Sequence, residues 1–193
     1  MNVLVIPEDF RKDQYLLKPV VEAMLTWVGK PRARVRVCCD PLLGGVHQAL
    51  NWPQILEILL RYKGMVDLFL LVVDRDGEPQ RRSALDRLES LAQGELKGSA
   101  VFLSENAWQE LEVWALAAAD LPSDWTWADV RSHRNSKEAY FEPYASQRGV
   151  ADEPGGGRRF LGREAGGKYA RVRALCREDV ESLERRVASE VCR

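Results

Sequence analysis

The sequence lacks the features that mark several common protein classes. Its two histidines and four cysteines form no CxxC pair, no zinc-type spacing and no Cys–His or G-x-S-x-G nucleophile pattern. No apolar run approaches the roughly 20 residues that a membrane helix needs, and the apolar run at the N-terminus is too short for a signal peptide. We therefore expect a cytoplasmic protein with reduced, mostly buried thiols, no membrane contact and no covalent enzyme intermediate.

Nucleotide-binding loops are also missing. The chain contains no G-x-x-x-x-G-K-[ST] motif, and Gly44-Gly45 is too short for a dinucleotide fingerprint. Gly155-Gly156-Gly157 lacks the lysine and the strand–helix setting of a phosphate-binding loop, so a plain flexible loop is the simpler interpretation. The sequence thus predicts no bound nucleotide cofactor.

Charge of neither sign dominates, because the net charge is −1, but the two signs are unevenly distributed. Residues 1–130 carry 14 basic and 19 acidic side chains, and residues 131–193 carry 14 basic and 10 acidic ones. An acidic body suits a metal pocket and a basic segment suits a polyanionic substrate. Two solvated surfaces that differ by chance would give the same counts.

What the chain does have is a regular alternation of strand and helix signals. Short apolar runs predict strands at 3–6, 35–39, 66–73 and 99–103, and amphipathic spacing predicts helices at 17–28, after an Asn51 cap, around 85–91 and at 107–119. This alternation predicts an α/β fold with a mostly parallel central sheet flanked by helices. We expect residues 1–120 to form this domain. Residues 121–193 are expected to form a helical, loop-rich basic extension packed on it, which ends in an amphipathic helix.

Acidic residues follow the predicted strands, at the edge of a parallel sheet where ligands gather. They are Glu8 and Asp9, then Asp40, then Asp74 and Asp76, then Glu105. The sharpest pattern is Asp74-x-Asp76-Gly77, because it leaves an apolar strand and two carboxylates at this spacing can converge on one cation. Oxygen ligands suit Mg²⁺ or Mn²⁺ rather than zinc. An ordinary Asp-Gly surface turn is the alternative.

Glu8 after the first strand and Asp74-x-Asp76 after a later strand resemble the acidic signature of TOPRIM domains, which occur in topoisomerases, primases and overcoming-lysogenization-defect (OLD) nucleases. The chain looks most like the small stand-alone bacterial proteins related to the OLD nucleases. It shares with them Glu112-Val113-Trp114 and a downstream lysine, for which Lys137 is the candidate. The resemblance covers about residues 1–140 and implies a Rossmann-like TOPRIM fold.

The resemblance further implies a Mg²⁺-dependent (or Mn²⁺-dependent) nuclease that cleaves phosphodiester bonds, in DNA rather than RNA, plausibly in bacterial defence. Glu8, Asp74, Asp76 and Glu112 would be its metal ligands, and Lys137 would neutralise the scissile phosphate. Asp9 could take the place of Glu8, and Glu110 that of Glu112. We favour Glu112 because it shares a predicted helix face with Trp108 and Ala115.

The segment 148–177 carries eight basic and three acidic side chains and could hold a nucleic-acid backbone. Its candidate contacts are Arg158, Arg159, Arg163 and Lys168. A solvated helix face with internal salt bridges is the alternative. Two other functions remain open: a TOPRIM-fold interaction or regulatory subunit that works with a separate ATPase, and a phosphate-ester or nucleotide-binding domain outside this family.

Overall fold

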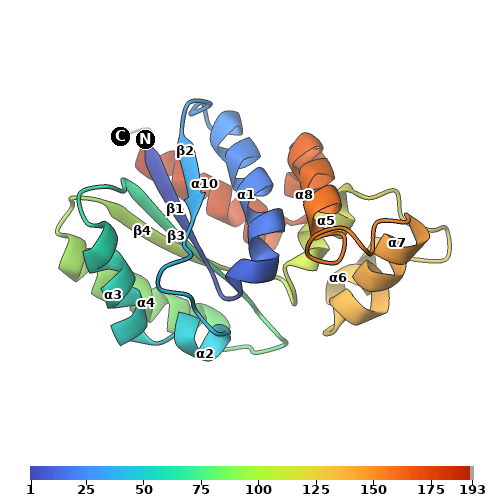
Figure 1. The fold of residues 1–193 in the computed structure, drawn as a ribbon, viewed down its shortest axis with the longest axis horizontal. Helices are drawn as coiled ribbons and strands as arrows, with labels where there is room; N and C mark the ends of the chain where they lie inside the picture. The colour runs from blue at the N-terminus through green and yellow to red at the C-terminus, as the bar shows by residue number, and fades with distance from the viewer. Residues whose placement is uncertain (192–193) are drawn as a thin grey trace.

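The computed structural model describes residues 1–191 and builds them around a parallel sheet of four strands (Figure 1). The strands are β1 (Asn2–Pro7), β2 (Arg34–Val37), β3 (Leu68–Asp74) and β4 (Val101–Ala107), in the order β2-β1-β3-β4. The run 66–73 is almost wholly apolar because β3 lies inside the sheet and is covered on both faces. The α/β class with a parallel sheet is thus confirmed, and the arrangement is consistent with a Rossmann-like fold.

The register of the sheet decides which residues meet at its carboxyl edge. Val3 pairs with Leu68 and Pro7 pairs with Val72, so β3 extends two residues beyond the end of β1. Asp74, the last residue of β3, therefore lies level with the chain that leaves β1 at Glu8. On its other side, Asp74 pairs with Ala107 at the end of β4.

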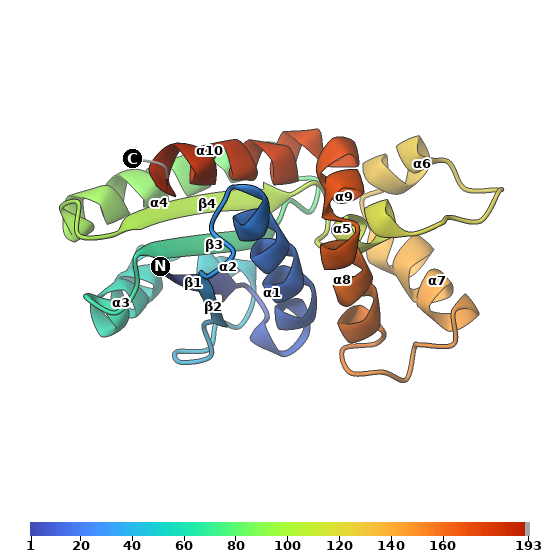
Figure 2. The same cartoon turned by 90° about the horizontal axis from the view of Figure 1, so that it is seen from above.

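Helices cover both faces of the sheet (Figures 1 and 2). One face packs against α2 (Val46–Ala49), α3 (Trp52–Tyr62) and α4 (Arg81–Leu96). As predicted, Asn51 caps α3 by accepting a hydrogen bond from the backbone N–H of Gln54. The other face packs against α1 (Phe10–Trp27), α5 (Glu112–Ala118), α8 (Arg158–Gly167), α9 (Tyr169–Leu175) and α10 (Ser182–Val191).

Helix α1 begins seven residues earlier than the predicted start at residue 17. Asp9 caps it by accepting a hydrogen bond from the N–H of Arg11, at 2.9 Å. Pro19 therefore lies inside the helix, where it cannot donate to the carbonyl of Tyr15. The backbone of α8 packs against this turn at Gly162, where an added Cβ would overlap the Tyr15 oxygen. The close approach of α8 to α1 carries the residues at the start of α8 towards the carboxyl edge.

The predicted boundary between a fourth strand at 99–103 and a helix at 107–119 is wrong. Strand β4 continues to Ala107, and α5 begins only at Glu112. Glu105 therefore lies within β4 rather than after it. Its carboxylate is tolerated in the strand because Arg82 and Arg186, at 3.3 and 3.7 Å, reach it from α4 and α10.

The remaining elements lie between α5 and α10. They are α6 (Trp127–Ser132), the π-helical turn η1 (Lys137–Phe141), α7 (Glu142–Gln147) and a second π-helical turn, η2 (Arg177–Glu181). Phe141, Leu161 and Val172 share one buried cluster with Val20 and Trp114. The hydrophobic core thus crosses the predicted boundary at residue 120. No helix among residues 1–191 has the length and apolar character to cross a bilayer.

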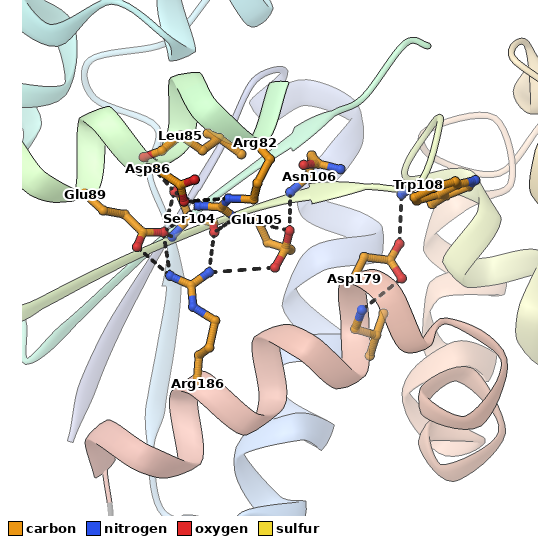
Figure 3. Close-up of polar contacts among 11 residues, drawn as sticks. Arg82, Leu85, Asp86, Glu89, Ser104, Glu105, Asn106, Trp108, Asp179 and Arg186 are labelled. Carbon is orange, nitrogen blue, oxygen red and sulfur yellow. Dashed lines mark hydrogen bonds and ion pairs between the residues drawn. The ribbon is translucent and has the colours of Figure 1, made fainter. Parts of the chain in front are cut away.

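A polar network closes the outer edge of β4 (Figure 3). The N–H of Ser104 donates to Glu89 at 2.7 Å, and its carbonyl accepts from Arg82 at 2.7 Å and from Arg186 at 2.9 Å. Arg186 also pairs with Glu89, at 2.5 Å, which ties α10 to α4. Side chains therefore occupy the backbone groups of Ser104, with which another strand would otherwise pair.

Candidate functional site

Five acidic residues gather at the carboxyl edge of the sheet, and we call them the acidic cluster: Glu8, Asp13, Asp74, Asp76 and Glu112. The backbone N–H of Asp74 donates to Oε2 of Glu8 at 3.2 Å, which sets the Glu8 carboxylate beside the end of β3. Oδ1 of Asp74 accepts from the N–H of Leu111 at 2.8 Å. Glu8, Asp74 and Asp76 are all partly exposed, so one side of the cluster is open to solvent.

Crowding and burial raise the pKa values of this cluster. Burial is the main cause that raises the pKa of Glu8 to about 7, and repulsion from Asp76 and Glu112 raises it as well. The hydrogen bond from the Asp74 N–H lowers this pKa but does not offset the rise. Burial likewise raises the pKa of Asp13 to about 7. The pKa of Asp74 is held well above its usual range by burial and by the neighbouring charges of Glu8 and Glu112. The cluster therefore favours uptake of protons or of another cation.

Glu112, a member of the cluster, forms a buried ion pair with Arg158, and the two residues have 4% and 5% of their surfaces exposed. Nε of Arg158 donates to Oε1 of Glu112 at 2.9 Å, Nη2 contacts the same oxygen, and Nη1 donates to the carbonyl of Gly155 at 2.6 Å. Arg158 is thus an internal residue and not part of a solvent-facing basic surface. The sequence indicated neither this pairing nor Asp13, because both depend on how α1, α5 and α8 pack.

The two alternative acids have local structural partners. Asp9 caps α1. Glu110 accepts hydrogen bonds from the N–H of Lys137 at 2.6 Å and from the hydroxyl of Ser136 at 3.1 Å, so it holds the start of η1. The ammonium of Lys137 pairs with Glu138 at 2.9 Å, and Glu112 is near enough to raise the Lys137 pKa further.

The Asp74-x-Asp76-Gly77 turn is held by one residue that the sequence did not reveal, Gln109. Its backbone carbonyl accepts from the N–H groups of Arg75, at 2.9 Å, and Asp76, at 3.0 Å, and its side-chain oxygen accepts from Gly77 at 2.9 Å. Asp76 and Gln109 both have positive φ, 53° and 68°, which is strained for residues with a side chain. The turn donates three hydrogen bonds to this one facing residue, and these bonds hold it in place.

Arg75, between the two aspartates, stacks on Trp108. Its guanidinium lies 4.0 Å from the ring centroid of Trp108, and that of Arg131 lies 5.5 Å from it. The N–H of Trp108 donates to Asp179 at 2.8 Å (Figure 3). Trp108 lies before α5 and is partly exposed, so the predicted helix face that it shares with Glu112 and Ala115 is wrong.

Arg81, at the start of α4, is the cation beside Asp76 and was also missed by the sequence pattern. It is only 9% exposed, and its Nη2 lies 3.5 Å from both Asp76 Oδ2 and the Arg75 carbonyl. Its Nε is buried and has no hydrogen-bond acceptor among the described residues. A buried donor without an acceptor is costly, so this guanidinium is suited to an anion that enters the site.

A cleft of about 620 Å³ opens beside Glu8. Phe10 and Arg11 line one side, and the chain from Leu42 to Gly45 lines the other. The N–H of Gly45 donates to the carbonyl of Glu8 at 3.0 Å, so the loop after β2 is fixed to the end of β1. Space for a substrate therefore adjoins the acidic cluster.

Within residues 1–191, no three histidine, cysteine, aspartate or glutamate side chains are already arranged to hold a metal ion. The donor set itself consists of carboxylate oxygens, which suits Mg²⁺. That ion usually keeps several waters and binds through one or two carboxylates together with substrate phosphates. The residues of the cluster fit such a site in chemistry, and the remaining ligands would be water or substrate oxygens.

The other three basic candidates, Lys168, Arg159 and Arg163, do not share contacts with one another. Lys168 donates to the carbonyl of Ala118 at 3.1 Å and lies 3.7 Å from Asp120. Arg159 and Arg163 are exposed, and neither has an ion-pair partner in the part of the chain that the structure describes.

Comparison with protein-family models, with curated proteins and with solved structures returned no match. What this protein does must therefore be inferred from the site itself.

Proposed function

We propose that this protein is a Mg²⁺-dependent phosphodiesterase of the TOPRIM type that acts on nucleic acid. One observation carries the proposal. The partly buried carboxylates of Glu8 and Asp74 have too few cationic partners, and close to them lies Arg81, whose buried Nε has no hydrogen-bond acceptor among the described residues. A divalent ion together with a phosphate group supplies both missing charges at once. A site that recognised only a metal ion would have no use for the free donor of Arg81.

Two features support the TOPRIM assignment beyond the parallel α/β fold. Strands β1 and β3 are neighbours, so Glu8 and the Asp74-x-Asp76 turn, which are far apart in sequence, meet at one edge. Glu112 lies two residues before the buried Trp114. It is close enough to Asp74 for its charge to raise the pKa of Asp74.

Each residue of the site has a proposed part. Glu8, Asp74 and Asp76 would hold the ion through carboxylate oxygens. When bound, the ion would supply positive charge to a phosphate and lower the pKa of a bound water. Arg81 would donate to a phosphate oxygen. Glu112, which the sequence analysis favoured as a further metal ligand, is instead paired with Arg158, and the two residues would form the inner wall of the site.

The test is a nuclease assay with purified protein on plasmid, single-stranded DNA and RNA in Mg²⁺, Mn²⁺ or EDTA. We expect metal-dependent cleavage that falls by about 100-fold or more in Asp74→Asn, which removes one charge without changing shape. Asp86→Asn is the matched control, because Asp86 is an exposed acid that pairs with Arg82 on α4.

The outcomes separate the alternatives. No cleavage in either metal, together with no metal-induced rise in melting temperature, would overturn the proposal. Cleavage that needs an added ATPase would instead favour the regulatory or interaction subunit. Equal losses in Asp74→Asn and Asp86→Asn would remove the acidic cluster from the reaction.

A further inference from the structure

The two edges of the sheet are treated differently. Side chains from α4 and α10 occupy the outer edge of β4, as described above, whereas no strand pairs with the outer edge of β2 in the described chain. Strand β2 and the residues before it read Lys30-Pro-Arg-Ala-Arg-Val-Arg-Val, with a basic side chain at every second position. Arg32, Arg34 and Arg36 are all exposed, and we call these three residues the arginine ladder.

Alternate residues of a strand share one face, and the register identifies that face here. Arg34 pairs with Asn2, and Arg36 pairs with Leu4. Leu4 belongs to the core cluster beneath α3 and α4, so Arg34 and Arg36 lie on that side of the sheet, beyond the cover of the helices. Together with Tyr62 and Met65 they line a groove of about 340 Å³.

The ladder arginines have no neutralising partner in the described chain, a property that they share with seven other arginines. Ten other arginines of the described chain form ion pairs with acidic side chains: Arg61, Arg81, Arg82, Arg131, Arg148, Arg158, Arg171, Arg173, Arg185 and Arg186. None of the three ladder arginines has an ion pair with any residue in 1–191. Arg34 and Arg36 lie two residues apart on one face of β2, so their unneutralised guanidinium groups repel each other, and an extended polyanion relieves that repulsion.

We propose that the arginine ladder binds the phosphate backbone of a single-stranded nucleic acid, apart from the acidic cluster. Side chains two residues apart on a strand are about 6.6 Å apart, a spacing close to that of successive phosphates along an extended single strand. The Tyr62 ring and Met65 in the adjoining groove offer apolar surface to the bases. The inference deepens the proposed function, since it names the form of the substrate.

The position of the ladder agrees with this role. Arg36 is level with Leu4, four residues before Glu8 and so about 13 Å from it along the strand direction. The chain that continues from β2 forms the wall of the cleft beside Glu8, from Leu42 to Gly45. A strand of nucleic acid held on β2 therefore leads towards the acidic cluster.

Charged residues on an edge strand also prevent edge-to-edge pairing, which is the competing explanation. Charge reversal distinguishes nucleic-acid binding from protection of the edge, because Arg34→Glu/Arg36→Glu keeps the edge charged and changes only the sign of the charge. Arg34→Lys/Arg36→Lys keeps both charge and sign. Arg87→Glu/Lys97→Glu is the matched control, since it reverses two exposed basic side chains, on α4 and at its C-cap, that have no ion-pair partner among the described residues.

The experiment measures fluorescence anisotropy of labelled oligothymidylate in EDTA over a series of salt concentrations, so that no cleavage takes part. We expect Arg34→Glu/Arg36→Glu to weaken binding at least 10-fold and to reduce the slope of log K against log salt by about 1.4, at about 0.7 for each phosphate contact. The lysine variant should bind nearly as the wild type does. Melting temperatures and gel filtration establish that each variant is folded and monodisperse.

Unchanged affinity after charge reversal of the ladder would overturn the proposal, and so would an equal loss in the Arg87→Glu/Lys97→Glu control. Because the assay needs no metal, it is independent of the cleavage test. Ladder-dependent binding by a protein that cleaves nothing would leave this inference standing while the proposed catalytic function failed.

Discussion

Glu8, Asp13 and Asp74 are three carboxyl groups that lose water on folding without gaining enough cationic partners. Burial is the largest cause of the raised pKa in each of them. Carboxylates in stable proteins are more often arranged so that the folded state lowers the pKa, which makes a raised pKa in neighbouring groups a mark of a functional site.

These pKa values predict how stability depends on pH. For Glu8 the pKa rises from 4.5 to about 7, and for Asp13 from 3.8 to about 7. The folded chain then keeps protons that the unfolded chain releases, so the contribution of both groups is greatest below about pH 4 and falls as the pH rises to about 7. In EDTA, these groups should lower the melting temperature over that range.

Addition of Mg²⁺ should raise the melting temperature above pH 7 and have little effect at pH 5, because the ion competes with protons for the same oxygens. Thermal unfolding at each pH with Mg²⁺ or EDTA measures both effects, and Asp74→Asn should reduce the Mg²⁺ effect. A Mg²⁺ effect of the same size at pH 5 and pH 8 would contradict the assignment of the ion to these carboxyls.

The Glu112–Arg158 pair predicts a stability effect of another kind. Arg158→Leu leaves the Glu112 carboxylate buried without its partner and should lower the free energy of unfolding by about 3–5 kcal/mol. The double variant Glu112→Gln/Arg158→Leu should recover much of that loss. Urea unfolding of both variants measures the difference. Equal destabilisation of the single and double variants would show that Arg158 stabilises the fold by packing rather than by charge.

At the scale of elements, the turn after β3 is shaped by the chain after β4. Gln109 accepts hydrogen bonds from three successive N–H groups of the turn. The position of Asp76 thus depends on a neighbouring connection as well as on its own strand. Gly77 suits this turn because its φ is 69°, a conformation that glycine adopts without strain, and the atoms nearest to an added Cβ, at 3.3 Å, belong to the Arg134 side chain.

Gln109→Ala tests this dependence. It removes the acceptor for Gly77 but leaves the backbone carbonyl, so the fold should remain while Asp76 loses its fixed position. We expect Mg²⁺ affinity, read from the Mg²⁺ concentration needed to raise the melting temperature, to fall by about 10–100-fold. Gln93→Ala, an exposed change on α4, serves as the control. Unaltered Mg²⁺ affinity in Gln109→Ala would show that the two backbone hydrogen bonds alone hold the turn.

At the scale of the whole molecule, residues before and after 120 share one core. Phe141, Leu161 and Val172 are buried in the same cluster as Val20 and Trp114. The chain should therefore unfold in one cooperative step. A fragment of residues 1–120 should expose the faces of α1 and α5 that α8 covers and should aggregate. Circular dichroism and calorimetry of the full chain and the fragment check this, and two separate transitions in the full chain would contradict it.

The sequence by itself determined the local features of this protein. Apolar runs marked the four strands, Asn51 marked the start of α3, and the Asp74-x-Asp76 turn was placed at a strand end, because these signals lie within a few adjacent residues. The extent of β4 was misjudged, since Glu105 and Asn106 look like loop residues unless the arginines that reach Glu105 are known.

Only the tertiary structure decided which side chains meet. Asp13, Arg81, Gln109 and the pairing of Glu112 with Arg158 were not visible in the sequence, since each acts on residues of another element. The register of β1 on β3 brings Glu8 to Asp74, and the packing of α8 on α1 brings Arg158 to Glu112. Periodicity along a chain describes one element at a time, whereas electrostatics and hydrogen bonding depend on distances between elements, which only packing sets.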